Sequence, residues 1–295
     1  MSFATRKINL RFILGANQGV FDETGNNAVD LTGLRCELSL VNTQGVALNQ
    51  LDLTVYGMTL SLMNKLTILQ NGLVLGIYNQ ILVTAGQGDD LALIFSGHML
   101  TGYEDFSAAP ESAFVVKAYG SGATLYQAPQ PLSYKGAVAA ATIAGAIART
   151  MVPPLALEND GVTAVLHDVN LPGDPITQLR KLAKAARFSW TTDDAAGVLA
   201  IYPQGKNRES LNAVKLTAQT GLVGYPAFND KGAIFSSFFN PNIKVAGKVQ
   251  VTSVLSPVNG VWYPYNVHHD LQSEVPDGRW FTHIEAQRNI NEGSQ

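Results

Sequence analysis

The first third of the chain alternates apolar and polar residues in short runs. Every second residue is apolar in Lys7–Leu14, Arg35–Val41 and Leu51–Val55. A period of two places the apolar side chains of a β-strand on one face. Further strand-like runs occur at Ile81–Thr84, Ala92–Leu100 and Phe114–Tyr119. Strands this short and closely spaced predict a β-barrel or a β-sandwich.

Residues 66–88 carry no charge, which raises the question of a membrane span. A span needs about 20 predominantly apolar residues. This segment is interrupted by polar residues and glycines, namely Gln70, Asn71, Gly72, Gly76, Asn79 and Gln80. Because Asn-Gly is a strong hairpin signal, we predict two strands, Leu66–Leu69 and Leu73–Tyr78, around Asn71-Gly72. For residues 60–65, a short helix is the alternative to a strand.

The composition changes after residue 120. Gly120–Lys135 contains glycine, proline and several polar residues, and predicts a joint. The next segment, Ala137–Ala148, reads AVAAATIAGAIA and has no charge until Arg149. Alanine is the best helix former, and a helix that is apolar all round must be buried. We therefore predict a buried helix that ends at Pro153-Pro154.

A second helix is predicted to begin at Asp174, with Asp174 as N-cap and Pro175 in the first helical position. Its apolar stripe consists of Ile176, Leu179, Leu182, Ala183 and Ala186. A hairpin follows, with strands Phe188–Thr191 and Val198–Tyr202 and a tip that begins at Asp193-Asp194. Helices followed by a hairpin predict a small α+β module between two β-rich regions.

The segment Gly224–Ser253 has the pattern of a compact β-meander. A turn is predicted at residues 229–232, followed by a strand over Ala233–Phe239. Asn240-Pro241-Asn242 breaks that strand, because proline lacks an N–H and asparagine favours turns. Ile243–Val245 is predicted as the next strand, and alternation from Val249 onward predicts a third.

This part of the chain resembles the tail hub proteins of bacteriophages, especially the Mu-like baseplate hubs of contractile tails. The resemblance is carried by GLVG at 221–224, GAIF at 232–235, FFNPNI at 238–243 and GKV at 247–249. It continues through Asn259–Tyr263, Val267–His269 (before a predicted loop) and Trp280–Glu285. The chain departs from the pattern after the histidines, where DLQS at 270–273 replaces the Gly-Asp often found in such hubs.

The resemblance implies a mainly β fold, in which two β-barrel-like domains of the tail-tube type flank the α+β module. The expected domains are residues 1–122, 123–205 and 206–295. It further implies a homotrimer whose paired barrels form a ring of pseudo-six-fold symmetry. Such a ring joins the tail tube to the spike or tip protein and contacts other baseplate proteins. Its lumen lets the tape-measure protein and DNA pass. The expected location is the virion, with assembly in the host cytoplasm.

Composition agrees with a protein whose surface is covered by neighbours. Charged residues make up 15% of the 295 residues, against about 25% in an average domain. Apolar residues make up 46%, which is enough for sizeable cores. The net charge of −3 implies no strongly basic face for nucleic acid, as suits a channel through which DNA slides. A merely neutral, glycine-rich surface is the alternative.

The single cysteine, Cys36, excludes an internal disulfide. We expect it to be a small buried hydrophobe in a protein assembled in a reducing cytosol. The first residues, MSFATRKINLRF, lack the continuous apolar region of a signal peptide.

Two groups of titratable residues are candidates for reactive sites. His268, His269 and Asp270, with His283 and Glu285, suggest a metal site, but adjacent strand residues face opposite sides. Glu104, Asp105 and Glu111 suggest a glycosidase pair, yet they lie in a polar segment typical of a solvated loop. We therefore predict no catalytic residue, no metal site and no cofactor.

A basic cluster lies on the second predicted helix. It consists of Arg180, Lys181, Lys184 and Arg187. One interpretation is that these side chains bind phosphates or an acidic partner surface. The simpler interpretation is a helix face exposed to solvent.

Aromatic residues in the last quarter are the candidates for subunit contact. Phe235, Phe238 and Phe239 are too close in sequence to share one core face, and interface centres favour aromatic residues. The candidate interface residues are Tyr225, Phe235, Phe238, Phe239, Asn240 and Pro241. The alternative places them in an internal core and in a seam between the two barrels.

Two other hypotheses compete with the structural hub. A tail-associated cell-wall hydrolase requires paired catalytic carboxylates. A carbohydrate-binding β protein at the host surface requires a glycan site.

Overall fold

The computed structural model describes residues 5–45 and 48–288. Residues 1–4, which belong to the segment considered for a signal peptide, lie outside the described residues, as do residues 289–295 of the last expected domain. Among the described residues, no helix has the length and apolar character needed to cross a bilayer.

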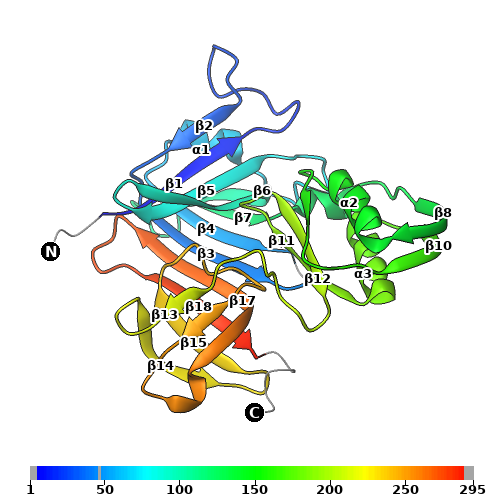
Figure 1. Ribbon diagram of the computed structural model, residues 1–295. Coiled ribbons are helices and arrows are strands. Elements are labelled where there is room, and N and C mark those ends of the chain that lie inside the picture. Colours follow the sequence, from blue (N-terminus) through cyan, green and yellow to red (C-terminus); the bar gives the residue numbers. More distant parts are fainter. Residues whose placement is uncertain (1–4, 46–47, 289–295) are drawn as a thin grey trace.

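The fold is mainly β, as predicted, and most strands belong to one large sheet (Figure 1). The strands of this 13-stranded sheet are β1 (Arg6–Ile13), β2 (Ala28–Leu31), β3 (Cys36–Thr43), β4 (Gln50–Tyr56), β5 (Gln80–Gln87), β6 (Asp90–Asp105), β7 (Ala113–Tyr119), β13 (Val214–Leu216), β14 (Leu222–Phe228), β15 (Ala233–Phe238), β16 (Val249–Val251), β17 (Gly260–Ser273) and β18 (Trp280–Gln287). The other elements are α1 (Leu60–Leu66), η1 (Gly122–Tyr126), β8 (Leu132–Ala139), α2 (Ala140–Thr150), β9 (Ala156–Asn159), β10 (Val165–Leu171), α3 (Pro175–Ala186), β11 (Phe188–Asp193), β12 (Val198–Pro203) and η2 (Ser256–Val258).

Pairing between β3 and β17 joins the first and last parts of the chain into one sheet. The strand order is β14-β15-β18-β17-β3-β4-β7-β6-β5-β1-β2, with β13 and β16 attached to β17. The sheet curls, so that Arg6 at the start of β1 donates a hydrogen bond of 2.5 Å to the Gly278 carbonyl before β18. The β regions are thus barrel-like, although the described strands form an open sheet and include no closed barrel.

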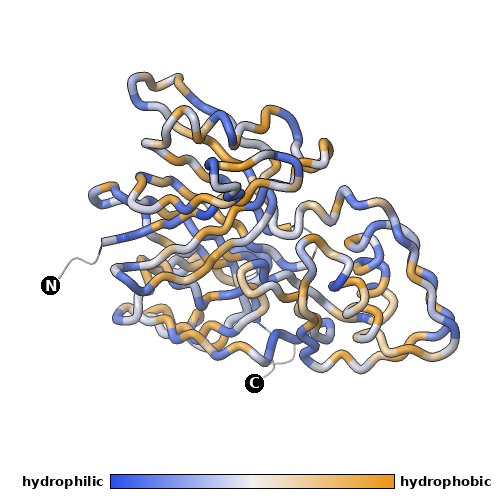
Figure 2. Tube along the Cα trace, turned by 90° about the horizontal axis from the view of Figure 1, so that it is seen from above, coloured by the Kyte–Doolittle hydropathy of each residue, from blue (hydrophilic) through white to orange (hydrophobic). Residues whose placement is uncertain are grey.

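Most buried hydrophobic residues of the described chain form three clusters. The first lies inside the curled sheet β1–β7, where Phe12, Phe95 and Phe114 are fully buried. It also contains the predicted buried cysteine, Cys36, and burial raises the pKa of that thiol to about 12. The second lies in the α+β module and the third under β15–β18. Figure 2 shows hydrophobic stretches interspersed with hydrophilic ones along the whole described trace.

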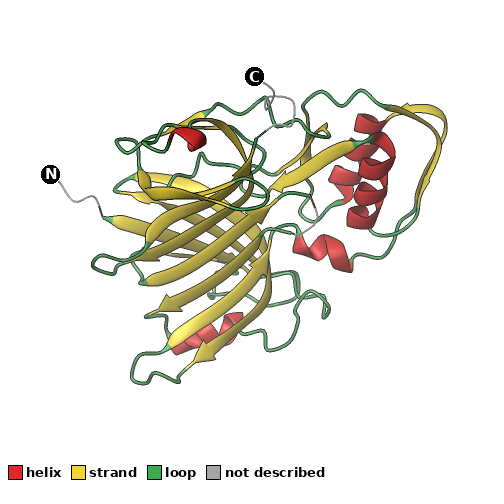
Figure 3. Ribbon diagram, turned by 90° about the horizontal axis from the view of Figure 1, so that it is seen from below, coloured by secondary structure: helices red, strands yellow, loops and turns green. Residues whose placement is uncertain are grey.

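The α+β module has the predicted helices and hairpin. α3 begins at Pro175 with Asp174 as N-cap, whose carboxylate accepts a hydrogen bond of 3.0 Å from the Thr177 N–H. Its stripe packs on α2, and β11 and β12 pair as a hairpin beside β9. Figure 3 shows the two helices beside the broad sheet, with the curved ribbon β8–β10 outside them.

Two predictions about local structure were wrong in the first half of the chain, one for residues 66–79 and one for residues 137–148. Residues 66–79 contain α1's end and a turn, not paired strands, and the short helix considered for residues 60–65 is present as α1. The Asn71 side chain accepts hydrogen bonds from the N–H groups of Leu73 and Val74, which favours a turn over a hairpin. The predicted helix over Ala137–Ala148 begins only at Ala140, because the residues before it pair with β10.

The predicted meander was also wrong in its connections. Ile243–Val245 is not a strand; it belongs to an irregular segment whose apolar side chains enter the third cluster. β15 pairs with β14 and β18, whereas β16 pairs with β13 and β17. The loop expected after Val267–His269 is absent, because β17 continues to Ser273 while paired with β3.

Candidate functional site

A buried polar cluster connects the α+β module to the first β region. Asp194, at the tip of the β11–β12 hairpin, accepts hydrogen bonds from Asn49 Nδ2 (2.5 Å) and Ser121 Oγ (3.0 Å). Asn49 also donates to the Thr192 carbonyl (3.1 Å). Burial raises the pKa of Asp194 to about 6. We call Asn49, Ser121, Thr192 and Asp194 the junction cluster.

The neighbouring Asp193 faces the last third of the chain. Its carboxylate pairs with Lys244 Nζ at 2.9 Å and with Arg208 Nη1 at 3.5 Å. Arg208, whose side chain is 3% exposed, also binds Glu158 through two hydrogen bonds of 2.7 and 2.9 Å. The pKa of Asp193 is lowered, because the two cations outweigh its desolvation. The hairpin tip therefore holds all three regions together, which the sequence did not reveal.

The turn Asn240-Pro241-Asn242 lies next to the tip of the β11–β12 hairpin. A cavity of about 30 Å³, lined by Asp193, Asp194, Lys244 and Pro241 among others, separates it from the hairpin tip. The Asn240 N–H donates to Thr282 Oγ1 at 3.1 Å. Asn240 and Pro241 are half-buried and serve contacts within the chain.

The predicted interface aromatics fall into two groups. Phe235 is buried in the third cluster, and Phe239 packs edge-on against His269 and Trp280 at centroid distances of 5.3 and 5.4 Å. In contrast, Tyr225 is 77% exposed and Phe238 is 55% exposed. Phe238 stacks on Phe281 across β15 and β18. The prediction of an intersubunit surface therefore rests on Tyr225 and Phe238.

The histidines lie on opposite faces of β17, as alternation requires. His268 faces His283 of β18 with ring centroids 5.6 Å apart. His268 is hydrogen-bonded to Ser39, and His283 is hydrogen-bonded to Ser236. His269 is buried on the other face against Thr282 Oγ1 at 2.9 Å, and burial lowers its pKa to about 3. Within residues 5–45 and 48–288, no three His, Cys, Asp or Glu side chains are grouped to hold a metal ion.

The acidic residues considered for glycoside hydrolysis have separate surroundings. Glu104 and Asp105 end β6, and Asp105 accepts a hydrogen bond from the Ser107 N–H, which lowers its pKa. Glu111 pairs with Arg35 at 2.7 Å. A general acid needs a raised pKa, but the hydrogen bonds from Ser107 lower that of the half-buried Asp105, and Glu111 is exposed.

The basic residues of α3 lie on its outer side. Arg180, Lys181, Lys184 and Arg187 are all exposed, and Lys181 Nζ donates to the Pro172 carbonyl at 3.2 Å. This arrangement is typical of a solvated helix face.

A family model described as "Baseplate hub gp41" matches residues 27–284. The chain belongs to this baseplate hub family. The sequence matches none of the curated proteins. As the resemblance implied, the hub is a structural protein of the phage tail baseplate, which makes it a component of the virion.

Solved structures of tail proteins share the hub's fold. The 43 kDa tail protein of prophage MuSo2 from Shewanella oneidensis is 11% identical, with a TM-score of 0.60 over 97% of this chain and 98% of that one. A tail protein from Neisseria meningitidis MC58 is 9% identical, with a TM-score of 0.63 over 97% of each chain.

The fold also extends to a secretion system. The E. coli c3393 protein is described as a component of the type VI secretion system with structural similarity to the T4 phage tail proteins gp27 and gp5. It is 11% identical to the hub, with a TM-score of 0.60 over 94% of this chain and 76% of that one. At these identities the likeness concerns the fold.

Proposed function

We propose that the hub acts as a homotrimeric ring of pseudo-six-fold symmetry that joins the tail tube to the spike or tip protein. The observation that carries this proposal is the single sheet formed by the first and last β regions through β3 and β17. Two β-rich units fixed in one subunit provide six such units in a trimer. A trimer of this kind presents six-fold-like contacts on one side and three-fold contacts on the other.

The three hydrophobic clusters support the proposed units 1–122, 123–205 and 206–295. The clusters are centred on β1–β7, on α2 and α3, and on β15–β18. Ion pairs and hydrogen bonds of Asp193 and Asp194 fix the middle unit to both others. A rigid subunit of this kind is suited to a mechanical role that needs no reactive residue, so we propose that the hub is not an enzyme.

The outer face of β3, β4, β17 and β18 is the surface we assign to the lumen. These four strands carry no lysine or arginine, and the cations beside them are paired within the chain: Arg279, just before β18, pairs with Asp270 and Glu37 at 2.9 and 3.8 Å, and Lys117 of β7 pairs with Asp52 at 3.9 Å. Because lysine and arginine contacts to phosphates supply non-specific DNA affinity, this face would let DNA and the tape-measure protein pass without adhering.

The remaining partners follow from the proposed position. The tail tube binds one side of the ring, the spike or tip protein binds the other, and further baseplate proteins contact the periphery, where the α+β module projects (Figure 1). The buried free thiol of Cys36 is compatible with assembly in a reducing host cytoplasm.

Mass measurement in solution tests the ring. Purified hub at micromolar concentration should have three times the chain mass of 31.6 kDa, and averaged electron micrographs should show a ring with six peripheral densities. A stable monomer, or a compact trimer without an open centre, would contradict the proposal.

A further inference from the structure

An uncharged loop between α1 and β5 exposes large apolar side chains. Leu69, Val74 and Leu75 are 77%, 64% and 57% exposed. Beside them, Leu125 and Tyr126 of η1 are 42% and 40% exposed. Single exposed apolar residues are ordinary, but a contiguous group of them marks an interaction surface. We call these five residues the apolar loop surface.

The loop cannot turn these side chains inward, because its backbone is fixed. The Gly72 N–H donates to the Leu100 carbonyl at 2.8 Å, and the Ile77 N–H donates to the Gly72 carbonyl at 2.7 Å. Asn71 Nδ2 donates to Tyr126 Oη at 3.0 Å, which ties the loop to η1. A surface held in place before binding loses little entropy when a partner arrives.

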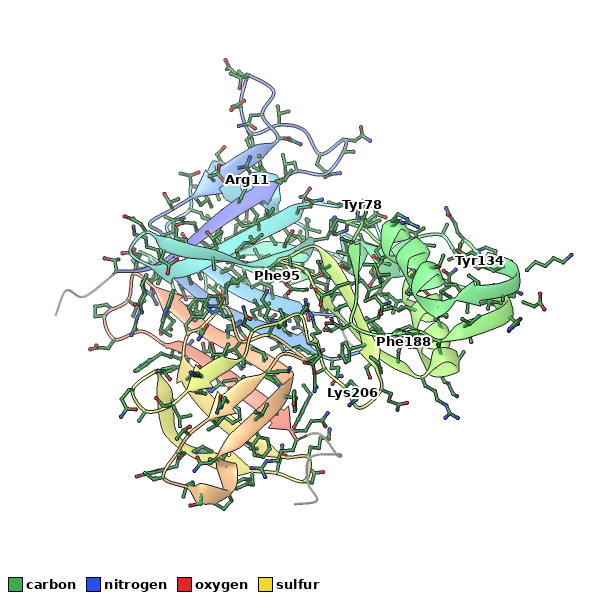
Figure 4. All side chains as sticks on the ribbon, in the orientation of Figure 1. Arg11, Tyr78, Phe95, Tyr134, Phe188 and Lys206 are labelled. Carbon is green, nitrogen blue, oxygen red and sulfur yellow. The ribbon has the colours of Figure 1, made fainter. Side chains whose placement is uncertain are left out.

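A groove without charged residues continues from this surface. It encloses about 450 Å³ and is lined by Tyr78, Tyr126, Gln127, Ala128, Gln130, Leu132, Thr150, Pro175 and Gln178. Figure 4 labels Tyr78 where the sheet meets the α+β module. Gln178 is held in place by donating to the Gln130 and Gly173 carbonyls at 2.7 and 2.9 Å. We call this the amide groove. It combines apolar side chains with amides: Pro175 and Gln178 are its buried lining residues, and Ala128 and Gln130 are exposed.

A second exposed apolar surface lies on β14 and β15. It contains Tyr225, Ile234 and Phe238, of which Tyr225 is 77% exposed and Ile234 is 36% exposed. Tyr225 stands on the irregular part of β14, between Gly224 at φ +66° and the buried Pro226. In the orientation shared by Figures 1 and 4, β14 lies at the lower left and Tyr78 lies above the centre, where the sheet meets the module. We call these three residues the aromatic patch.

We propose that the aromatic patch of one hub subunit binds the apolar loop surface and amide groove of the next, with Tyr225 entering the groove. This inference rests on the proposed ring and names its subunit contact. A ring closed head to tail requires two different, complementary patches on each chain. These two apolar patches lie at separate places on the subunit, and neither contains a charged side chain that the contact would desolvate.

The chemistry of the groove fits a tyrosine better than a charged or purely aliphatic side chain. Tyrosine has an apolar ring and a polar tip, and it is enriched at the energetic centres of interfaces. Leu132, Ala128 and Pro175 can contact the ring, while the amides of Gln127 and Gln130 can bond the hydroxyl. A groove of this volume lies in the range that takes small ligands or side chains.

Cysteine cross-linking tests the pairing directly, because the native Cys36 is buried. We expect a Tyr225→Cys, Gln130→Cys double variant to form interchain cross-links with a short bismaleimide, in a ladder that ends at three chains. The control double variant, Tyr225→Cys with Asp89→Cys, keeps the first position and moves the second to an exposed turn. It should remain uncross-linked.

A second measurement uses Tyr225→Ala, whose fold should be unaffected because the side chain is exposed. We expect trimer dissociation to occur at about 30-fold higher protein concentration or more, as for an interface hot spot. A wild-type trimer that neither cross-links through Gln130 nor weakens in Tyr225→Ala would overturn this inference and leave the ring standing. A wild-type monomer would overturn the ring itself. An intact Tyr225→Ala trimer that no longer binds the tail tube protein would assign the patch to that partner and also overturn the pairing.

Discussion

Asp194 Oδ2 lies 2.5 Å from Asn49 Nδ2, although the two residues are 145 positions apart in sequence. This hydrogen bond places the tip of the β11–β12 hairpin inside the first β region. Ser121 Oγ holds the other carboxylate oxygen at 3.0 Å, and a Cβ on Gly120 would collide with the carboxylate. The α+β module is therefore attached through a buried acid, and the charge on that acid affects the stability of the attachment.

The Asp194→Asn variant should become more stable relative to the wild type as pH rises, because only the wild type loses stability by ionising this residue. Burial raises the pKa of Asp194 from 3.8 to about 6 in the folded state. The unfolded chain thus releases the proton first, so the wild type loses stability between about pH 4 and pH 6. Asp194→Asn keeps the shape and cannot ionise. Its free energy of unfolding relative to the wild type should rise by about 2 kcal/mol between pH 4 and pH 7.

Urea unfolding at several pH values measures this difference. The exposed Asp230→Asn variant is the control, and its stability relative to the wild type should change much less with pH. A constant difference between Asp194→Asn and the wild type over the same range would show that the buried carboxyl ionises as easily in the folded chain as in the unfolded one.

The paired charges around Arg208 should contribute strongly to stability. The Arg208 side chain is 3% exposed and is shared by Glu158 and Asp193. Removing it leaves Glu158 without a cation and the buried Asp193 with Lys244 alone, so Arg208→Ala should cost about 3 kcal/mol. Lys117→Ala removes the exposed pair with Asp52 and should cost less than about 1 kcal/mol. Chemical denaturation of both variants compares them, and equal losses would contradict the assignment.

Local signals in the sequence predicted both helices of the module and its hairpin, although α2 begins three residues later than predicted. Asp174 and Pro175 mark the start of α3 by contacts within one turn, and β11 and β12 pair across a short connection. The role of the hairpin tip was not predictable in this way. Asp193 and Asp194 have partners at Lys244, Arg208, Asn49 and Ser121, which the chain brings together only when all three regions fold.

The wrong predictions share this physical origin. Asn71-Gly72 has the local preference of a hairpin, but the loop docks by backbone hydrogen bonds on Leu100 and Gly102 of β6. Ile243 and Val245 have strand-like residue types, yet they fill the third hydrophobic cluster from an irregular segment. For the candidate interface aromatics, the sequence indicated only that Phe235, Phe238 and Phe239 cannot share one core face; the structure buries Phe235 and exposes Phe238. The amide groove gave no sequence signal, because its lining comes from four elements and two loops that are far apart in the chain.

Removing the N-cap of α3 should destabilise the module by a moderate amount. The Asp174 carboxylate accepts hydrogen bonds from the Thr177 N–H and hydroxyl at 3.0 and 2.5 Å. Asp174→Ala loses both and should cost about 1 kcal/mol. Asp174→Asn keeps an acceptor of equal rank and should remain close to the wild type. Thermal unfolding followed by circular dichroism separates the two variants, and an Asn variant as unstable as the Ala variant would contradict capping as the cause.

His269 should make the hub sensitive to mild acid. It is buried between Phe239 and Thr282, and desolvation lowers its pKa from 6.5 to about 3. Below pH 6.5 the unfolded chain gains a proton that the folded chain does not, so stability falls as pH falls. His269→Gln removes this dependence while keeping a polar atom for Thr282. The wild type should lose about 2 kcal/mol more than this variant between pH 7 and pH 5.

The exposed His167→Gln variant is the matched control for this measurement, because its side chain lies on the outer ribbon β8–β10 in contact with solvent. It should follow the wild-type pH dependence. If His269→Gln and His167→Gln lose the same stability between pH 7 and pH 5, the folded state accommodates a protonated His269. The acid sensitivity would then be assigned to other histidines whose pKa burial lowers: the buried His98, with a pKa of about 4, and the half-buried His268, whose pKa is also lowered by the nearby His283.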